Sequence, residues 1–270
     1  MKSDLLDRWP ELVSALVAAI DSEWSRGGPL HHWRKGDSDQ VVSDLDLRLD
    51  VAIRTTLSGY YPRLPVLSEE LGWLHPDEKA STLGVAVVDP VDGTDSLVQH
   101  RNSWWTSVAL LKEGVPQAGI IYQPTTGISH DSHAPRDKPP ASGAIGLSPD
   151  QFEEGETPAL RRSGGLESFA VVPVPHAVEK VAAVVEGRCD ASLFLPSRKS
   201  PGWNSWDLAA VLAIARANGA LLRATDGGEI HMDDLNAYQR VPWICARDPA
   251  LWEAIQAALI TTGGDEDSAA

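Results

Sequence analysis

The sequence is poor in sulfur and in aromatic side chains other than tryptophan. It holds two cysteines, two methionines, three phenylalanines and four tyrosines in 270 residues. Cys189 and Cys245 stand alone in apolar surroundings, without the close spacing of a metal-binding cysteine pair. We therefore expect two buried free thiols, no disulfide and no cysteine-based metal site.

Long apolar runs are also missing. No stretch approaches the roughly 20 apolar residues of a membrane-spanning helix. Asp4, Asp7, Arg8 and Glu11 lie where a signal peptide would be apolar. These absences predict a cytoplasmic protein that does not associate with a membrane.

Positive charge is scarce. The chain has 23 Lys and Arg against 38 Asp and Glu, a formal net charge of −15. This balance argues against a nucleic acid polymer as partner, because polyanions are bound by clustered Lys and Arg. A small anionic substrate is still compatible with this charge if bound metal ions and a few local cations bind it. The excess of acids can also serve solubility alone.

The N-terminal half, residues 1–127, is predicted to be an α+β domain. Apolar residues at helical spacing indicate helices over 11–25 and from Ser43 to Gly59. The strands expected here cover residues 64–67, 85–88, 107–111 and 118–122.

Residues 128–167 are rich in Pro, Gly, Ser and charge, and only 144–147 resemble a strand, so we expect an irregular junction there. Strands and helices alternate over 168–262, which predicts an α/β domain. The acidic residues 263–270 are expected to form a disordered tail. The fold class is therefore α/β, with two differently built halves.

The most informative segment is VDPVDGT, at the end of a predicted buried strand. Pro90 cannot donate to a sheet, so the strand is expected to stop there, with Asp89 and Asp92 at its mouth. Gly93 and Thr94 follow as a turn that can offer backbone N–H groups and a hydroxyl to an anion. Carboxylates beside such a turn indicate a divalent-cation site that holds a phosphate. The alternative is an ordinary solvated turn.

Three more acids have positions that suit the same site. Glu69 follows the preceding predicted strand, 20 residues before Asp89. Asp207 opens a predicted helix, where it could simply complement the helix dipole. Asp46 follows Ser43 at capping-box spacing, which would be a purely structural role.

These motifs together resemble the inositol monophosphatase superfamily of lithium-sensitive, magnesium-dependent phosphomonoesterases. The resemblance rests on DPVDGT, the Glu-Glu pair upstream, Ser-x-x-Asp before it and Trp-Asp at the start of a late helix, and it spans roughly residues 35 to 260. It implies a layered α/β/α/β/α sandwich and two or three Mg²⁺ ions. Homodimers are common in this superfamily. LSEE at 67–70 and AGIIYQP at 118–124 look most like the 3'(2'),5'-bisphosphate nucleotidase branch.

Carried across by position, the resemblance implies one Mg²⁺ ion on Glu69, Asp89 and the carbonyl of Val91. It implies a second ion on Asp89, Asp92 and Asp207.

The resemblance further implies that Asp46 and Thr94 orient the attacking water near the ion on Glu69. The amides of Gly93 and Thr94 would hold the phosphate. One departure is His176-Ala177, which stands where relatives carry Gly-Ser.

The branch implies a phosphate-ester or nucleotide substrate, most like the 3'-phosphate of adenosine 3',5'-bisphosphate or of its sulfated form in sulfate assimilation. Arg198 and Lys199 are adjacent cations that could bind a second substrate phosphate, and the alternative is a solvated loop. Inositol 1-monophosphate and histidinol phosphate remain open as substrates. A catalytically degenerate member that binds or regulates is the alternative from another class.

Overall fold

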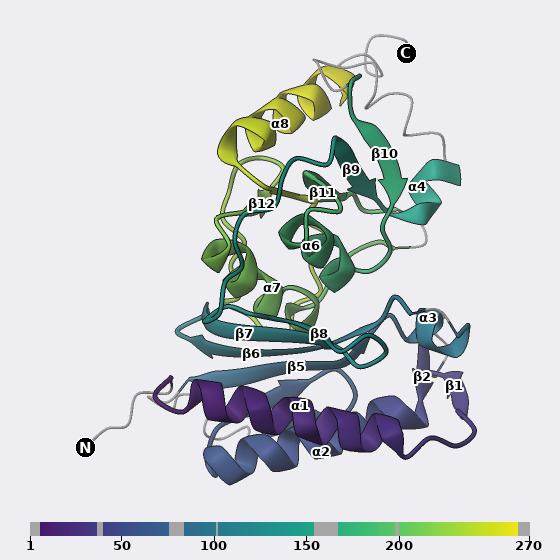
Figure 1. The fold of residues 1–270 in the computed structure, drawn as a ribbon, viewed down its shortest axis with the longest axis vertical. Coiled ribbons are helices and arrows are strands. Elements are labelled where there is room, and N and C mark those ends of the chain that lie inside the picture. The colour runs from purple at the N-terminus through teal and green to yellow at the C-terminus, as the bar shows by residue number, and fades with distance from the viewer. Residues whose placement is uncertain are drawn as a thin grey trace. The chain divides into compact units, whose positions relative to one another are not determined.

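The computed structural model describes residues 6–36, 40–75, 84–100, 102–153, 167–197 and 200–263. The chain divides into two compact units, each a β-sheet covered by helices (Figure 1). The first unit comprises residues 1–134, 205–214 and 232–236, and the second comprises 135–204, 215–231 and 237–270. In the part of the chain that the structure describes, no helix is long and apolar enough to cross a membrane.

The first unit contains a six-stranded sheet in the order β4-β3-β5-β6-β7-β8. Its strands are β3 (Val66–Ser68), β4 (Gly72–Leu74), β5 (Val85–Asp92), β6 (Trp105–Lys112), β7 (Val115–Gln123) and β8 (Ile128–Asp131). β3 and β5 are parallel, and the other neighbours are antiparallel. Because parallel strands end at the same edge, Glu69 follows β3 next to the end of β5, and its N–H donates to Val88 O at 3.1 Å.

Two helices, α1 (Trp9–Ser25) and α2 (Asp44–Tyr60), lie along one face of this sheet (Figure 1). Their apolar stripes form one core with the inward side chains of β5, β6 and β7. A small antiparallel pair, β1 (His32–Arg34) and β2 (Val41–Ser43), leads into α2. The Ser43 and Asp46 capping box begins α2, as its sequence spacing suggests.

The helix α7 (Ser205–Ala217) belongs to the first unit through its residues 205–214. Ala118 and Ile120 of β7 face the core under α1 and α2, so Gly119 between them faces the other side of the sheet. A Cβ at Gly119 would lie 2.4 Å from the carbonyl oxygen of Ala210. The glycine therefore allows the backbone of α7 to approach the sheet closely.

The strand end expected before Pro90 is wrong, because β5 continues to Asp92. The pairing register between β5 and β6 shifts between Asp89, which faces Ser107, and Asp92, which faces Trp105. This bulge lifts Pro90 out of the regular ladder, so its missing N–H leaves no gap in the pairing.

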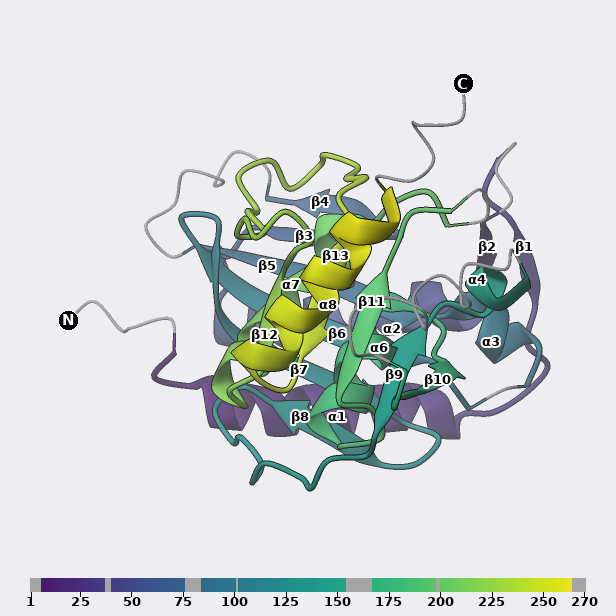
Figure 2. The same cartoon turned by 90° about the horizontal axis from the view of Figure 1, so that it is seen from above.

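The second unit holds a five-stranded sheet in the order β10-β9-β11-β13-β12. Its elements are β9 (Ala144–Leu147), α4 (Pro149–Glu153), β10 (Ala170–Pro173), α6 (Ala177–Val185), β11 (Ala191–Phe194), β12 (Leu221–Ala224), β13 (Trp243–Ala246) and α8 (Pro249–Gly263). Ala191 and Leu193 pack with α8, which lies over the sheet in Figure 2. Ser192 points to the opposite face and donates to Lys180 O of α6 at 2.8 Å. Cys189 and Cys245 are buried free thiols.

The span 128–167, expected to be an irregular junction, contains β8, β9 and α4 among its described residues. β8 extends the first sheet and β9 lies inside the second, so long-range pairing gives order to a segment with loop-like composition. The two domain ranges expected from the sequence stay predictions. The acidic tail lies outside the described residues beyond Gly263, which ends α8.

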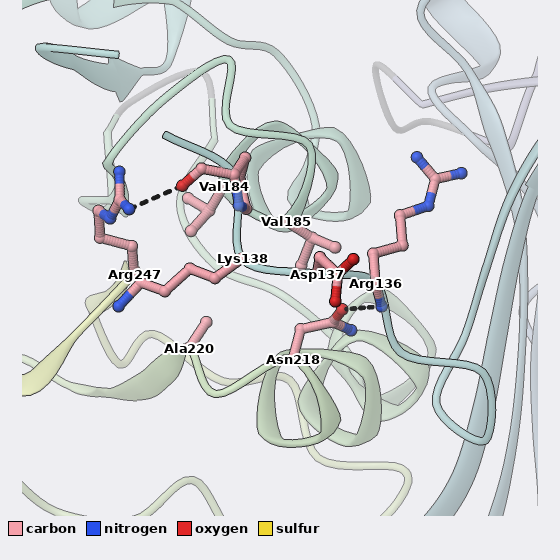
Figure 3. Close-up of a pocket in the computed structure, with 9 residues that line it drawn as sticks. Arg136, Asp137, Lys138, Val184, Val185, Asn218, Ala220 and Arg247 are labelled. Atoms are coloured by element: carbon pink, nitrogen blue, oxygen red, sulfur yellow. Dashed lines mark hydrogen bonds between the residues drawn. The ribbon is translucent and has the colours of Figure 1, made fainter. Parts of the chain in front are cut away.

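The connection before β9 is fastened by Asp190 and Arg247. Asp190 accepts from the N–H groups of Ser142 and Gly143 and from Arg247. Arg247 also donates to the carbonyl of Pro139 (Figure 3). Burial alone would raise the pKa of Asp190, but Arg247 and the two N–H groups bring it below its ordinary value. The cavity beside them measures about 10 Å³, room for about one water molecule.

Candidate active site

Three acids converge in the first unit. Asp89 and Asp92 lie at the bulged end of β5, and Asp207 lies in the first turn of α7. Each offers a carboxylate oxygen, and these three oxygens lie within 4.8 Å of one another. Asp89 is 1% exposed and Asp92 is 7% exposed. The close approach of α7 to the sheet at Gly119 thus joins residues that are far apart in the sequence.

The electrostatics of this cluster are unfavourable without a cation. Burial raises the pKa of Asp89 well above its ordinary value, and the charges of Glu69, Asp92, Asp207 and Asp46 raise it further. A buried group of acids is a cost to the fold unless positive charge offsets it. Carboxylate oxygens are the ligands that Mg²⁺ prefers, so the donor set fits a hard divalent cation.

The structure places Glu69 beside this cluster, and its carboxylate is bound by a lysine. Lys35 Nζ lies 2.7 Å from Glu69 Oε1 and 2.6 Å from Glu70 Oε1. Burial and the charge of Glu69 raise the pKa of Glu70 to about 7, although Lys35 acts in the opposite direction. Sequence reasoning missed Lys35, because one lysine in a polar segment has no periodicity or spacing that would mark it.

Asp46 closes the capping box of α2 and also contacts Thr94. Its Oδ2 accepts from the N–H of Ser43 at 3.0 Å, which closes the capping box, and its Oδ1 accepts from Thr94 Oγ1 at 2.8 Å. Burial raises the pKa of Asp46 to about 6, despite the hydrogen bonds that favour its charged form. The helix cap therefore fixes a carboxylate against the threonine of the VDPVDGT segment.

A left-handed turn follows β5 and leads directly into a short helix. Gly93 has φ of +101°, a left-handed conformation that glycine adopts without strain, and it directly precedes α3 (Thr94–Val98). The first N–H groups of a helix have no partner within that helix. Thr94 Oγ1 also lies 3.2 Å from Val91 O, so the carbonyl of Val91 faces the same turn.

The structure thus brings together Asp46, Asp89, Val91, Asp92, Gly93, Thr94 and Asp207, with Glu69 adjacent. Their roles as ligands and catalytic groups stay predictions. Arg198 and Lys199 lie outside the described residues.

Comparison with known proteins gives a family match and a fold match. Residues 6–139 match the model of the inositol monophosphatase family. The histidinol-phosphatase of Mycobacterium tuberculosis is 27% identical over 245 residues, 83% of this chain and 85% of that protein. The 3'(2'),5'-bisphosphate nucleotidase CysQ of Salmonella typhimurium is 28% identical over 128 residues, 47% of this chain and 50% of that protein.

Among solved structures, an IMPase/NADP phosphatase complexed with Mg²⁺ and phosphate superposes with a TM-score of 0.74 at 17% identity. The match covers 94% of this chain and 95% of that chain, and at this identity it shows a shared fold. The expected mixed α/β fold of the inositol monophosphatase type is confirmed. The chain is thus similar to the inositol monophosphatase family over residues 6–139, and nearly its whole length has the fold of the inositol monophosphatase type.

Proposed function

We propose that this protein is a Mg²⁺-dependent hydrolase of phosphate monoesters. The observation that carries the proposal is the group of Asp89, Asp92 and Asp207 beside the left-handed turn at Gly93. Acids alone would repel a phosphate, so the site can hold one only when cations lie between them. The match of residues 6–139 to the inositol monophosphatase family supports the same chemistry.

The residues divide into those that would hold cations and those that would handle the phosphate. Asp89, Asp92 and Asp207 would hold one Mg²⁺ ion. Glu69, Asp89 and the Val91 carbonyl would hold another. Binding of that second ion would replace the contact between Lys35 and Glu69. When bound, such cations neutralise phosphate charge and lower the pKa of water.

Thr94 and Asp46 would orient the attacking water. Thr94 Oγ1 donates its proton to Asp46, so the lone pairs of that oxygen face away from the carboxylate and can accept from a water molecule. Asp46 fixes the hydroxyl, and the helix cap at Ser43 fixes Asp46. The N–H groups of Gly93 and Thr94 would bind the phosphate oxygens.

The direct test is phosphate release from a panel of monoesters in Mg²⁺ and in excess EDTA. We expect release only with Mg²⁺ and, as the family resemblance implies, inhibition by low concentrations of Li⁺. A rate in EDTA within tenfold of the Mg²⁺ rate would exclude the cation mechanism. Specific Mg²⁺ binding without turnover of any ester would favour a binding or regulatory protein.

Two candidate substrates are each favoured by a different similarity to known proteins. Histidinol phosphate is favoured by a relative that aligns over 83% of the chain. Adenosine 3',5'-bisphosphate is favoured by the nucleotidase relative and by the LSEE and AGIIYQP segments. Comparing kcat/KM for these two esters and inositol 1-monophosphate distinguishes them, because the preferred substrate should exceed the others by at least about tenfold, or about 1.4 kcal/mol.

A further inference from the structure

The turn that carries Glu69 and Glu70 is held at both ends by one buried carboxylate of α2. Asp50 is 0% exposed, and its Oδ2 accepts from Ser68 Oγ at 2.5 Å and from the N–H of Leu71 at 3.1 Å. Ser68 directly precedes the Glu-Glu pair and Leu71 directly follows it. A single side chain therefore fixes the two residues that flank the pair.

Arg54, one helical turn after Asp50, completes this arrangement. Its Nε donates to Asp50 Oδ1 at 2.5 Å, while its Nη2 donates to Ser68 Oγ and, at 2.6 Å, to the carbonyl of Gly72 in β4. The planar guanidinium can serve these three acceptors at once because its donors are held in a fixed fork. Asp50 and Arg54 thus connect α2 to both strands that the turn joins.

Stability alone is a weak reason for such a pair. Removing two charges from water costs free energy, and well-packed apolar residues in their place are often as stable or more stable. The pair does provide geometry, since β3 has only three residues and its turn must present Glu69 beside Asp89. Hydrogen-bonded partners behind a metal ligand commonly control how well that ligand binds.

We propose that Asp50 and Arg54 are positioning residues that hold the Glu69–Glu70 turn in the geometry needed for cation binding. The proposal rests on the proposed function, in which Glu69 binds Mg²⁺. Their hydrogen bonds go to each other and to the residues that flank the Glu69–Glu70 pair, so both would act through the turn.

The test compares the wild-type protein with Arg54→Lys and with the apolar double variant Asp50→Leu, Arg54→Met. The double variant removes both charges together, so no buried charge is left without its partner. The melting temperature reports what the lost hydrogen bonds to Ser68, Leu71 and Gly72 cost the fold. Leu57→Ala, on the same helix and fully buried, is the control for general destabilisation. For each protein we would measure Mg²⁺ affinity by calorimetry without substrate, the half-saturating Mg²⁺ in hydrolysis, kcat and the melting temperature.

We expect Mg²⁺ affinity to fall roughly 10- to 100-fold in both variants, in line with the loss of partners behind a metal ligand. Leu57→Ala should keep its Mg²⁺ affinity even if its melting temperature falls as much. Variants that follow the control in all four measurements would overturn the proposal while leaving the proposed function intact. A wild-type protein that binds no Mg²⁺ would overturn both.

Discussion

At the scale of single residues, Asp92 provides the sharpest test of the acid cluster. Asp92→Asn keeps the size of the side chain and removes one charge from the three-acid group. Cation neutralisation is worth several kcal/mol in the transition state, so kcat should fall at least roughly a hundredfold.

The measurement is phosphate release at saturating Mg²⁺, with the exposed Asp95→Asn as the matched control. Equal activity of Asp92→Asn and wild type would show that the Asp92 carboxylate has no role in catalysis.

The raised pKa values of Asp46 and Glu70 let us predict how the stability of the cation-free protein depends on pH. Their pKa values are raised by burial from 3.8 to about 6 and from 4.5 to about 7. Between about pH 4 and pH 7 the folded state therefore binds more protons than the unfolded state, and stability falls as pH rises. Asp190, whose pKa is lowered, acts in the opposite direction but below this window.

We expect the melting temperature in EDTA to decrease steadily from pH 4 to pH 7, and Asp46→Asn to flatten part of that slope. A melting temperature that rises over this range would contradict the prediction.

Substitution of Arg198 and Lys199 tests the hypothesis that the substrate is a nucleotide with two phosphates. A second phosphate needs a cationic contact away from the acid cluster, and contacts between charged groups are worth roughly 1.5 to 3 kcal/mol each. Arg198→Ala, Lys199→Ala should therefore lose at least about tenfold in kcat/KM for adenosine 3',5'-bisphosphate, and should keep its rate on a monophosphate. Equal losses on both substrates would indicate a role in folding.

At the scale of elements, the contact between β7 and α7 decides where Asp207 lies. A Cβ at Gly119 would meet backbone atoms of Ala210 at 2.4 to 2.9 Å, so α7 would have to move away from the sheet. Ala210 is three residues after Asp207 and on the same side of the helix. Gly119→Ala should therefore lower both stability and Mg²⁺ affinity.

We expect a loss of roughly 1 to 3 kcal/mol in urea unfolding, together with a higher half-saturating Mg²⁺ concentration. Gly59→Ala in α2 is the matched control, because nothing lies within 4 Å of a Cβ there and alanine favours a helix. If both variants behave like wild type, α7 does not depend on this close approach.

The helices were largely predictable from the sequence, and the reason is local. The apolar spacing over 11–25 corresponds to α1 (Trp9–Ser25), because it records which side of a helix is buried. The Asp89–Asp92 pair was predictable because a proline and a glycine mark it. The continuation of β5 past Pro90 was not, since it depends on a bulge against Trp105 and Ser107.

The rest of the site depends on contacts between distant segments. Lys35 meets Glu69 across 34 residues, and Asp50 meets Ser68 across 18. The sequence spacing around Lys35 and Asp50 does not indicate these partners. The two contacts are therefore seen only in the folded chain.

At the scale of the whole molecule, a net charge of −15 and a buried acid cluster should make stability depend on the kind of cation present. Monovalent salt screens the overall repulsion, whereas Mg²⁺ should also bind the folded state specifically. At a free Mg²⁺ concentration of 100 Kd the gain is about 2.7 kcal/mol.

The check is the melting temperature in MgCl₂ and in KCl at equal ionic strength. MgCl₂ should stabilise more, and Asp92→Asn should remove most of that excess. Identical curves for the two salts would mean that Mg²⁺ acts only by screening.

The first unit is assembled from three separate stretches of the chain, and Asp207 comes from the second of them. A fragment that ends at residue 134 would contain Asp89 and Asp92 but would lack the third acid of the cluster. A genetic exchange that replaced everything after residue 134 would likewise have to supply a new helix with an acid at the same place. The two halves of this gene are therefore expected to be inherited together, because neither half alone encodes the site.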